Sequence, residues 1–99
     1  MHLIYLNTKM EQEKYSKLRY QLMESSTWPS LYMFKFIIPN SDEKVNAIKN
    51  LFPPKTKFAF KTSKDLKFIG ITVKKTMESA DAVIDIYIGA QDIEGIVIL

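Results

Sequence analysis

The sequence predicts an α+β domain in which a first helix precedes two strand–helix–strand units. Two observations support this fold class. Apolar residues recur at helical spacing in some segments, and they alternate or run together, as in strands, in others. The chain also has 99 residues, 46% of them hydrophobic and 25% charged, which is the size and composition of an ordinary globular protein.

The first element is a helix predicted from residue 10 to residue 24. Tyr15, Leu18 and Leu22 recur at helical spacing among good helix formers, and they form a single apolar stripe. Residues 1–9 precede this pattern, so we expect them to be poorly ordered unless something packs on them. The chain is therefore divided into a leader with a helix, residues 1–27, and a domain of residues 28–99.

The second element is a long apolar strand predicted over residues 30–38. Pro29 pushes the residue before it toward extended backbone. From Leu31 to Ile38 every residue except Lys35 is apolar, which is more apolar surface than a half-buried strand needs. Both faces of this strand should therefore be covered.

A second helix and a short strand follow. Asn40 is the predicted N-cap of this helix, and Glu43, three residues further along, completes the pattern of a capping box. Pro53 and Pro54 end the helix. Residues 57–62 then run Lys, Phe, Ala, Phe, Lys, Thr, a pattern of period two that predicts a short, exposed strand.

The last three elements are a strand, a helix and a strand. Residues 63–65 make a turn into a second long strand over residues 66–74. Ser79 caps the last helix, whose apolar residues recur at helical spacing, and residues 95–99 form the final strand.

This order leaves few topologies, because each crossover between parallel strands must be right-handed. The commonest is the βαββαβ arrangement called ferredoxin-like, with the first and third strands at the centre of the sheet and the second and fourth at its edges. The predicted fold is therefore α+β, a ferredoxin-like βαββαβ two-layer sandwich with an additional N-terminal helix. The two inner helices cover one face of its sheet.

The opposite face of the sheet, called the back face from here on, is predicted to mix apolar and basic side chains. Its members are Leu31, Met33, Ile37 and Phe68 with Lys35, Lys57, Lys61 and Lys74. An uncovered patch of this kind indicates a binding site. Three covers stay open: the N-terminal helix, a second copy of the protein, and a ligand or nucleic acid.

Two sets of candidate site residues follow from these covers. The candidate binding surface comprises Lys35, Lys57, Lys61, Phe68 and Lys74. The candidate association surface comprises Tyr15, Leu18, Leu22, Met33 and Ile37. Charge is also uneven along the chain, since residues 55–75 hold seven lysines against one acid, whereas residues 76–99 hold five acids and no base.

Four segments of the chain share one further pattern: WPSLYMFKFIIPNSDEKVNAI, then Ser63, Lys64, Lys67 and Phe68, then SADAVIDIY, and the ending EGIVIL. Together they cover about residues 12–99, and they resemble the YbeD-like family, small bacterial proteins that share a domain of unknown function. The resemblance implies a ferredoxin-like fold related to ACT-type regulatory domains, which bind small molecules at oligomer interfaces. Two departures are Gly70, where relatives carry a serine, and residues 38–41, which lack the glycine of ligand-binding ACT domains.

Side chains suited to catalysis are scarce. His2 is the single histidine and cysteine is absent, so no Ser-His-Asp system and no His-based or thiolate metal site is expected within the domain. Asp81 and Asp85 share a helix face, but two carboxylates alone make a poor cation site. Tyr32 and Tyr87 are interpreted as core residues. We therefore predict that the protein is not an enzyme and has neither cofactor nor metal.

Three classes of function stay open. The first is a regulatory or protein-interaction module that acts through self-association, as a homo-oligomer, or through a protein partner. The second is RNA binding on the basic open face of the sheet, and the third is ACT-like sensing of a small ligand. No membrane partner is expected, because no apolar run approaches the roughly 20 residues that span a bilayer. The opening MHLIYLNTK lacks the features of a secretory signal, so we expect a cytoplasmic protein.

Overall fold

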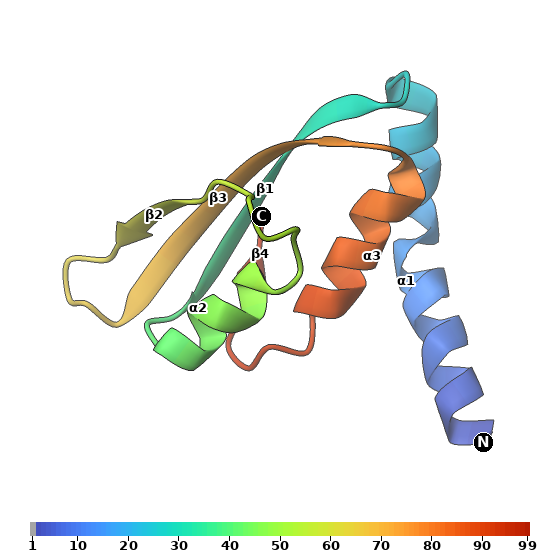
Figure 1. Ribbon diagram of the computed structural model, residues 1–99. Coiled ribbons are helices and arrows are strands. Elements are labelled where there is room, and N and C mark those ends of the chain that lie inside the picture. The colour runs from blue at the N-terminus through green and yellow to red at the C-terminus, as the bar shows by residue number, and fades with distance from the viewer. Residues whose placement is uncertain (1) are drawn as a thin grey trace.

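The computed structural model describes the backbone of residues 2–99 and the side chains of residues 14–99. Within them the elements follow the predicted order, a helix and then βαββαβ (Figure 1). The elements are α1 (His2–Ser25), β1 (Ser30–Pro39), α2 (Asp42–Lys49), β2 (Ala59–Thr62), β3 (Phe68–Met77), α3 (Ala80–Ala90) and β4 (Val97–Ile98). None of the helices in the described part of the chain is long and apolar enough to cross a membrane.

The strands form one antiparallel sheet with the order β2-β3-β1-β4. β1 and β3 pair along their whole length, from Ser30 opposite Met77 to Pro39 opposite Phe68. The edge strands are much shorter, and β4 pairs only with two residues in the second half of β1. The predicted placement of the first and third strands at the centre is therefore confirmed.

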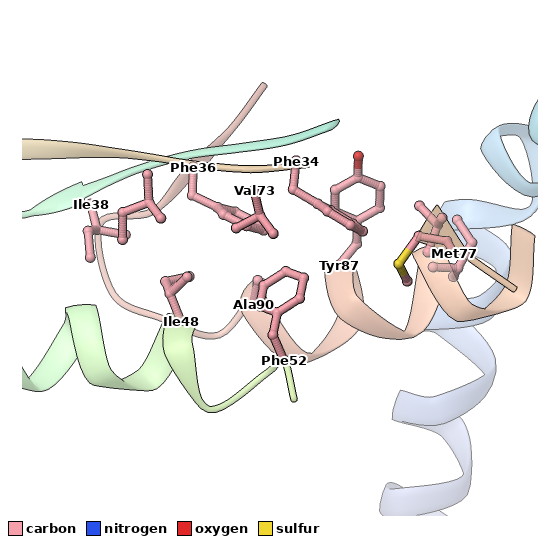
Figure 2. Packing of buried hydrophobic residues seen from close by; sticks show 12 residues of the cluster. Phe34, Phe36, Ile38, Ile48, Phe52, Val73, Met77, Tyr87 and Ala90 are labelled. Atoms are coloured by element: carbon pink, nitrogen blue, oxygen red, sulfur yellow. The ribbon is translucent and has the colours of Figure 1, made fainter. Parts of the chain in front are cut away.

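The helices lie on one face of this sheet, which makes the fold an α+β structure of two layers. Figure 1 shows α2 and α3 against the sheet and α1 alongside α3. The core fills the space between the layers, where each fully buried large apolar side chain contributes about 1.5–3 kcal/mol. Figure 2 shows side chains from β1 and β3 meeting those from α2 and α3. The largest fully buried ones are Phe34, Phe36, Ile38, Ile48, Ile71, Val73, Val83 and Ile84.

The two inner helices begin at serine caps. Ser79 caps α3 as predicted, since its hydroxyl accepts a hydrogen bond from the Ala82 N–H at 3.1 Å. The predicted cap of α2 is wrong by one residue, because the Ser41 hydroxyl accepts from the Lys44 N–H. Asn40 instead donates through its amide to the Leu66 carbonyl, which joins this turn to the turn before β3.

α1 begins earlier than the predicted residue 10 and packs on α3 rather than on the sheet. The apolar stripe of Tyr15, Leu18 and Leu22 is partly buried against the core. Arg19 Nε lies 2.6 Å from the Asp81 carboxylate in the first turn of α3, which adds an ion pair to this contact. Because α3 separates α1 from the sheet, α1 does not cover the back face. The side chain of His2, noted in the sequence, lies outside the described residues.

Candidate functional site

The back face is built from alternate residues of all four strands. Successive side chains of a strand point to opposite faces, so the residues of β1 between the buried Phe34, Phe36 and Ile38 face away from the helices. Residues paired directly across the sheet share a face. The register therefore places on the back face Leu31, Met33, Lys35 and Ile37 from β1, Phe68, Gly70, Thr72 and Lys74 from β3, Ala59 and Lys61 from β2, and Val97 from β4, followed by Leu99.

Large apolar side chains of this face are open to solvent. Leu31 is 69% exposed and Met33 47%, at the start of β1. At the other end of the sheet Phe68 is 45% exposed, and beyond the edge strand Leu99 is 66% exposed. Apolar residues that gather on one face, rather than scattering over the surface, mark a surface that is buried against something else.

A hollow lies at the centre of the back face, around Gly70. This residue stands between Ile37 of β1 and Lys61 of β2, and its missing side chain leaves a space of about 220 Å³ between its neighbours. A second hollow of about 240 Å³ adjoins it beside Phe68. The back face is therefore recessed at Gly70, between the long side chains of Ile37 and Lys61.

We predict that Gly70→Ala raises the free energy of unfolding. A Cβ added at Gly70 would lie 3.6 Å from its nearest neighbour, the Lys61 carbonyl oxygen, which is an ordinary contact. Alanine in a strand is about 0.5–1 kcal/mol more stable than glycine, because glycine loses more conformational freedom on folding. Urea denaturation followed by circular dichroism measures the change. A loss of stability would show that the hollow is packed more tightly than its geometry implies.

Lysines border the apolar part of the back face. Lys35, Lys61 and Lys74 are exposed on it, and no strand residue on this face is acidic. Lys57, just before β2, lines a separate hollow of about 360 Å³ together with Lys74. The face is therefore positively charged as well as apolar.

The carboxylate of the β2–β3 turn is engaged within that turn. Asp65 accepts hydrogen bonds from the Ser63 hydroxyl at 2.7 Å and from the Lys67 N–H at 3.1 Å. The Ser63 hydrogen bond first, and then the Lys67 N–H, hold the pKa of Asp65 below its usual value. Its charge therefore orders the turn at the end of the sheet.

The structure brings most of the candidate binding surface together. Lys35 and Lys61 flank the central hollow, Phe68 and Lys61 line the one beside it, and Lys57 and Lys74 line the third. The candidate association surface is divided. Its members Met33 and Ile37 lie on the back face, whereas Tyr15, Leu18 and Leu22 lie on the other side of the sheet against α3 and the core.

Several features of the back face and of the core were not predicted from the sequence. Val97 and Leu99 join the back face only through the pairing of β4 with β1. The hydroxyls of Tyr32 and Tyr87 lie 2.5 Å apart, although the two tyrosines were interpreted separately as core residues. Within residues 14–99 no cluster of three or more His, Asp or Glu side chains has the arrangement of a metal site.

No protein-family model matches the chain, and no curated protein or solved structure matches it either. The resemblance to the YbeD-like family therefore stays a prediction. We base the functional proposal on the geometry of the back face.

Proposed function

We propose that this protein is a non-enzymatic regulatory or interaction module that binds a protein partner through its back face. The strand order, with α2 and α3 on one face of the sheet, supports assignment of the fold as ferredoxin-like. Kinship to the YbeD-like family and to ACT-type regulatory domains is proposed on the same grounds.

The observation that carries this function is the exposure of an apolar, lysine-bordered face on a sheet whose other face holds the hydrophobic core. An antiparallel sheet with helices on one side normally presents polar residues to water on the other. Here β1 exposes Leu31 and Met33 at one end of the sheet, and β3 exposes Phe68 at the other. Burying these side chains against a partner removes apolar surface from water, which is the main driving force of protein association.

The charge of the back face selects the kind of partner. Lys35, Lys61 and Lys74 surround the apolar side chains without an acidic neighbour on the strands. Two back faces stacked directly on each other would bring lysines together, which opposes symmetric pairing of this kind. The favoured partner is therefore a protein surface that is apolar and acidic.

Self-association is the second form of the same function. The exposed side chains Asp85, Asp92 and Glu94 lie on α3 and just beyond it, whereas Asp81 already pairs with Arg19. A second copy therefore offers an acidic surface of its own to the lysines of the back face. Such a contact joins different surfaces of the two copies.

RNA binding on the same face is less favoured by the register. Modules that bind RNA on an open sheet stack bases on aromatic side chains of the central strands. The register of the described strands places Phe68 as the single aromatic residue on the back face, because Phe58 and Phe60 lie on the helix side, ring to ring with each other. Apolar aliphatic side chains stand where stacking rings are needed.

Site-specific photo-crosslinking in cells tests the proposed function. The photoreactive residue p-benzoylphenylalanine replaces Met33 on the back face, which is 47% exposed, or, as a control, the more exposed Met23 on α1, at 60%. We expect a protein adduct from position 33 and none from position 23. An adduct of twice the mass of the chain identifies self-association, and an adduct sensitive to ribonuclease identifies RNA instead.

Charge reversal gives the matching prediction. We expect Lys35→Glu combined with Lys61→Glu to lower the position 33 adduct by about tenfold, equivalent to about 1.4 kcal/mol of binding free energy. The control Lys17→Glu with Lys44→Glu makes the same change of net charge on α1 and α2. Equal adducts from positions 23 and 33, or equal loss in the two double variants, would contradict binding by the back face.

A further inference from the structure

A larger hollow lies on the helix side of the sheet, away from the back face. It is open to solvent, has a volume of about 550 Å³ and is lined by residues of α1, α3, β1, β4 and the end of the chain after it. Three tyrosines line it, Tyr15 from α1, Tyr32 from β1 and Tyr87 from α3. We call it the tyrosine hollow. Its volume falls within the roughly 300–1,000 Å³ that small-molecule sites occupy.

The short β4 strand explains why this space exists. β4 pairs only with Phe36 and Ile37, so the first half of β1, which carries Tyr32, continues past the end of its edge strand. α1 lies beside α3 rather than under this part of the sheet (Figure 1). Leu18 of α1 and Ile98 of β4 line this space, which gives the tyrosine hollow apolar walls.

One hydroxyl proton in the tyrosine hollow forms no hydrogen bond within the described residues. The Tyr32 and Tyr87 hydroxyl oxygens lie 2.5 Å apart, and either one donates to the other. Each phenol carries one proton, so the hydroxyl that accepts this hydrogen bond still has its own proton to donate. Among the described residues no acceptor is found for that proton. Because both residues line the tyrosine hollow, a bound molecule can receive it.

The Tyr87 hydroxyl remains protonated under ordinary conditions. Its ring rises from α3 toward the sheet with the hydroxyl oxygen at the far end, as Figure 2 shows. Burial raises the pKa of Tyr87 above its usual value, and the hydrogen bond with Tyr32 raises it further. Tyr87 therefore acts as a hydrogen-bonding hydroxyl and not as an anion.

Two further polar groups define the charge that fits the tyrosine hollow. The Tyr15 hydroxyl donates to Gln91 Oε1 at 3.2 Å, which leaves the Gln91 amide nitrogen as a donor in the wall. Lys14 lines the hollow with its Nζ 5.4 Å from the centre of the Tyr15 ring. No acidic side chain lines it among those that the structure describes. The tyrosine hollow thus combines hydrogen-bond donors and one positive charge with apolar walls.

We propose that the tyrosine hollow binds a small carboxylate with an apolar body. The carboxylate accepts the unused proton of the Tyr32–Tyr87 pair and lies near the Lys14 ammonium group. The apolar body packs against the tyrosine rings, Leu18 and Ile98. This site lies on the helix side of the sheet and meets the back face at Leu99, which lines both the tyrosine hollow and the central hollow. The substitutions that test each site fall on other residues, so each can be tested without the other.

Titration followed by amide chemical shifts in proton–nitrogen NMR spectra tests this site. The probes are sodium phenylacetate, sodium indole-3-acetate and sodium octanoate, with phenylacetamide as the neutral counterpart of phenylacetate. We expect at least one carboxylate to shift the amide signals of Tyr15, Tyr32, Tyr87 and Gln91 saturably. Phenylacetamide should bind at least about fivefold more weakly, because hydrogen bonds to a charged acceptor are about twice as strong as neutral ones.

Matched variants separate a specific site from general attraction to a basic protein. Lys14→Gln should raise the dissociation constant of the carboxylate about threefold. Lys17→Gln, also on α1 but outside the hollow, should leave it unchanged. Tyr32→Phe with Tyr87→Phe keeps both rings and removes both hydroxyls, and it should weaken binding about fivefold. The proposal is overturned if all three carboxylates leave these signals unchanged, if phenylacetamide binds as tightly as phenylacetate, or if the two lysine variants behave alike.

Discussion

Phe34→Ala should lower the free energy of unfolding by about 3–5 kcal/mol, the range for removing a fully buried phenylalanine ring. Phe34 has no exposed surface and lies at the centre of the aromatic core. Its ring centre is 4.8 Å from that of Tyr32, 5.3 Å from that of Phe52 and 5.7 Å from that of Tyr87. Because β1, α3 and the end of α2 all meet at this ring, the cavity cannot be filled by moving one neighbour. Urea denaturation measures the loss.

Phe60→Ala is the matched control for this prediction. Phe60 is on the same side of the sheet but 46% exposed on the edge strand β2, where it lies under the Lys49 ammonium group. Removing a half-exposed ring should cost about 1 kcal/mol. If Phe34→Ala abolishes folding, Phe34→Leu, which keeps most of the buried volume, supplies the comparison. Equal losses for Phe34 and Phe60 would mean that the core is not centred on β1.

Gly95→Ala should be the second most damaging single change, with an expected loss of about 2–4 kcal/mol. Gly95 has φ +81°, a backbone conformation that is strained for residues with a side chain. A Cβ at this position would also approach the Pro39 ring at 2.7 Å, and a proline ring cannot rotate away. The turn that leads into β4 therefore packs directly on the end of β1. The midpoint of thermal or urea unfolding reports the loss.

Gly89→Ala is the control, because its added Cβ would be as close to its nearest neighbour as the Cβ added at Gly95. The added Cβ would lie 2.7 Å from Leu51 Cδ2, but this atom is the end of a flexible side chain. Gly89 also lies within α3, where alanine is favoured over glycine by about 1 kcal/mol. We expect little net change. A large loss at Gly89 with a small loss at Gly95 would contradict this interpretation of the two contacts.

Much of the fold could be predicted from the sequence because its periodic signals are strong. The sequence predicts Leu31, Met33, Lys35 and Ile37 on one face of this strand, and the register confirms that they face away from the buried Phe34, Phe36 and Ile38. Ser79 was identifiable as a cap because a polar residue directly precedes an apolar helical pattern. The central position of β1 and β3 followed from their length and apolar content.

The features that could not be predicted depend on packing between distant segments. Asn40 and Ser41 are both good capping residues, and only the hydrogen bond from Asn40 to the Leu66 carbonyl decides between them. The apolar stripe of α1 fits either face of the domain, and the sequence carries no signal that selects α3. Tyr32 and Tyr87 are distant in the chain, so their hydroxyl contact appears only after the sheet and α3 are packed.

The alternation of β1 also bears on how the protein can evolve. Inward positions such as Phe34 and Phe36 are restricted by the aromatic core, whereas outward positions such as Met33 and Lys35 touch no part of the helix layer. Substitutions that change the core and substitutions that change the back face thus fall on alternate residues of one strand. The chemistry of the back face can therefore be altered at every second position of β1 while the aromatic core remains intact.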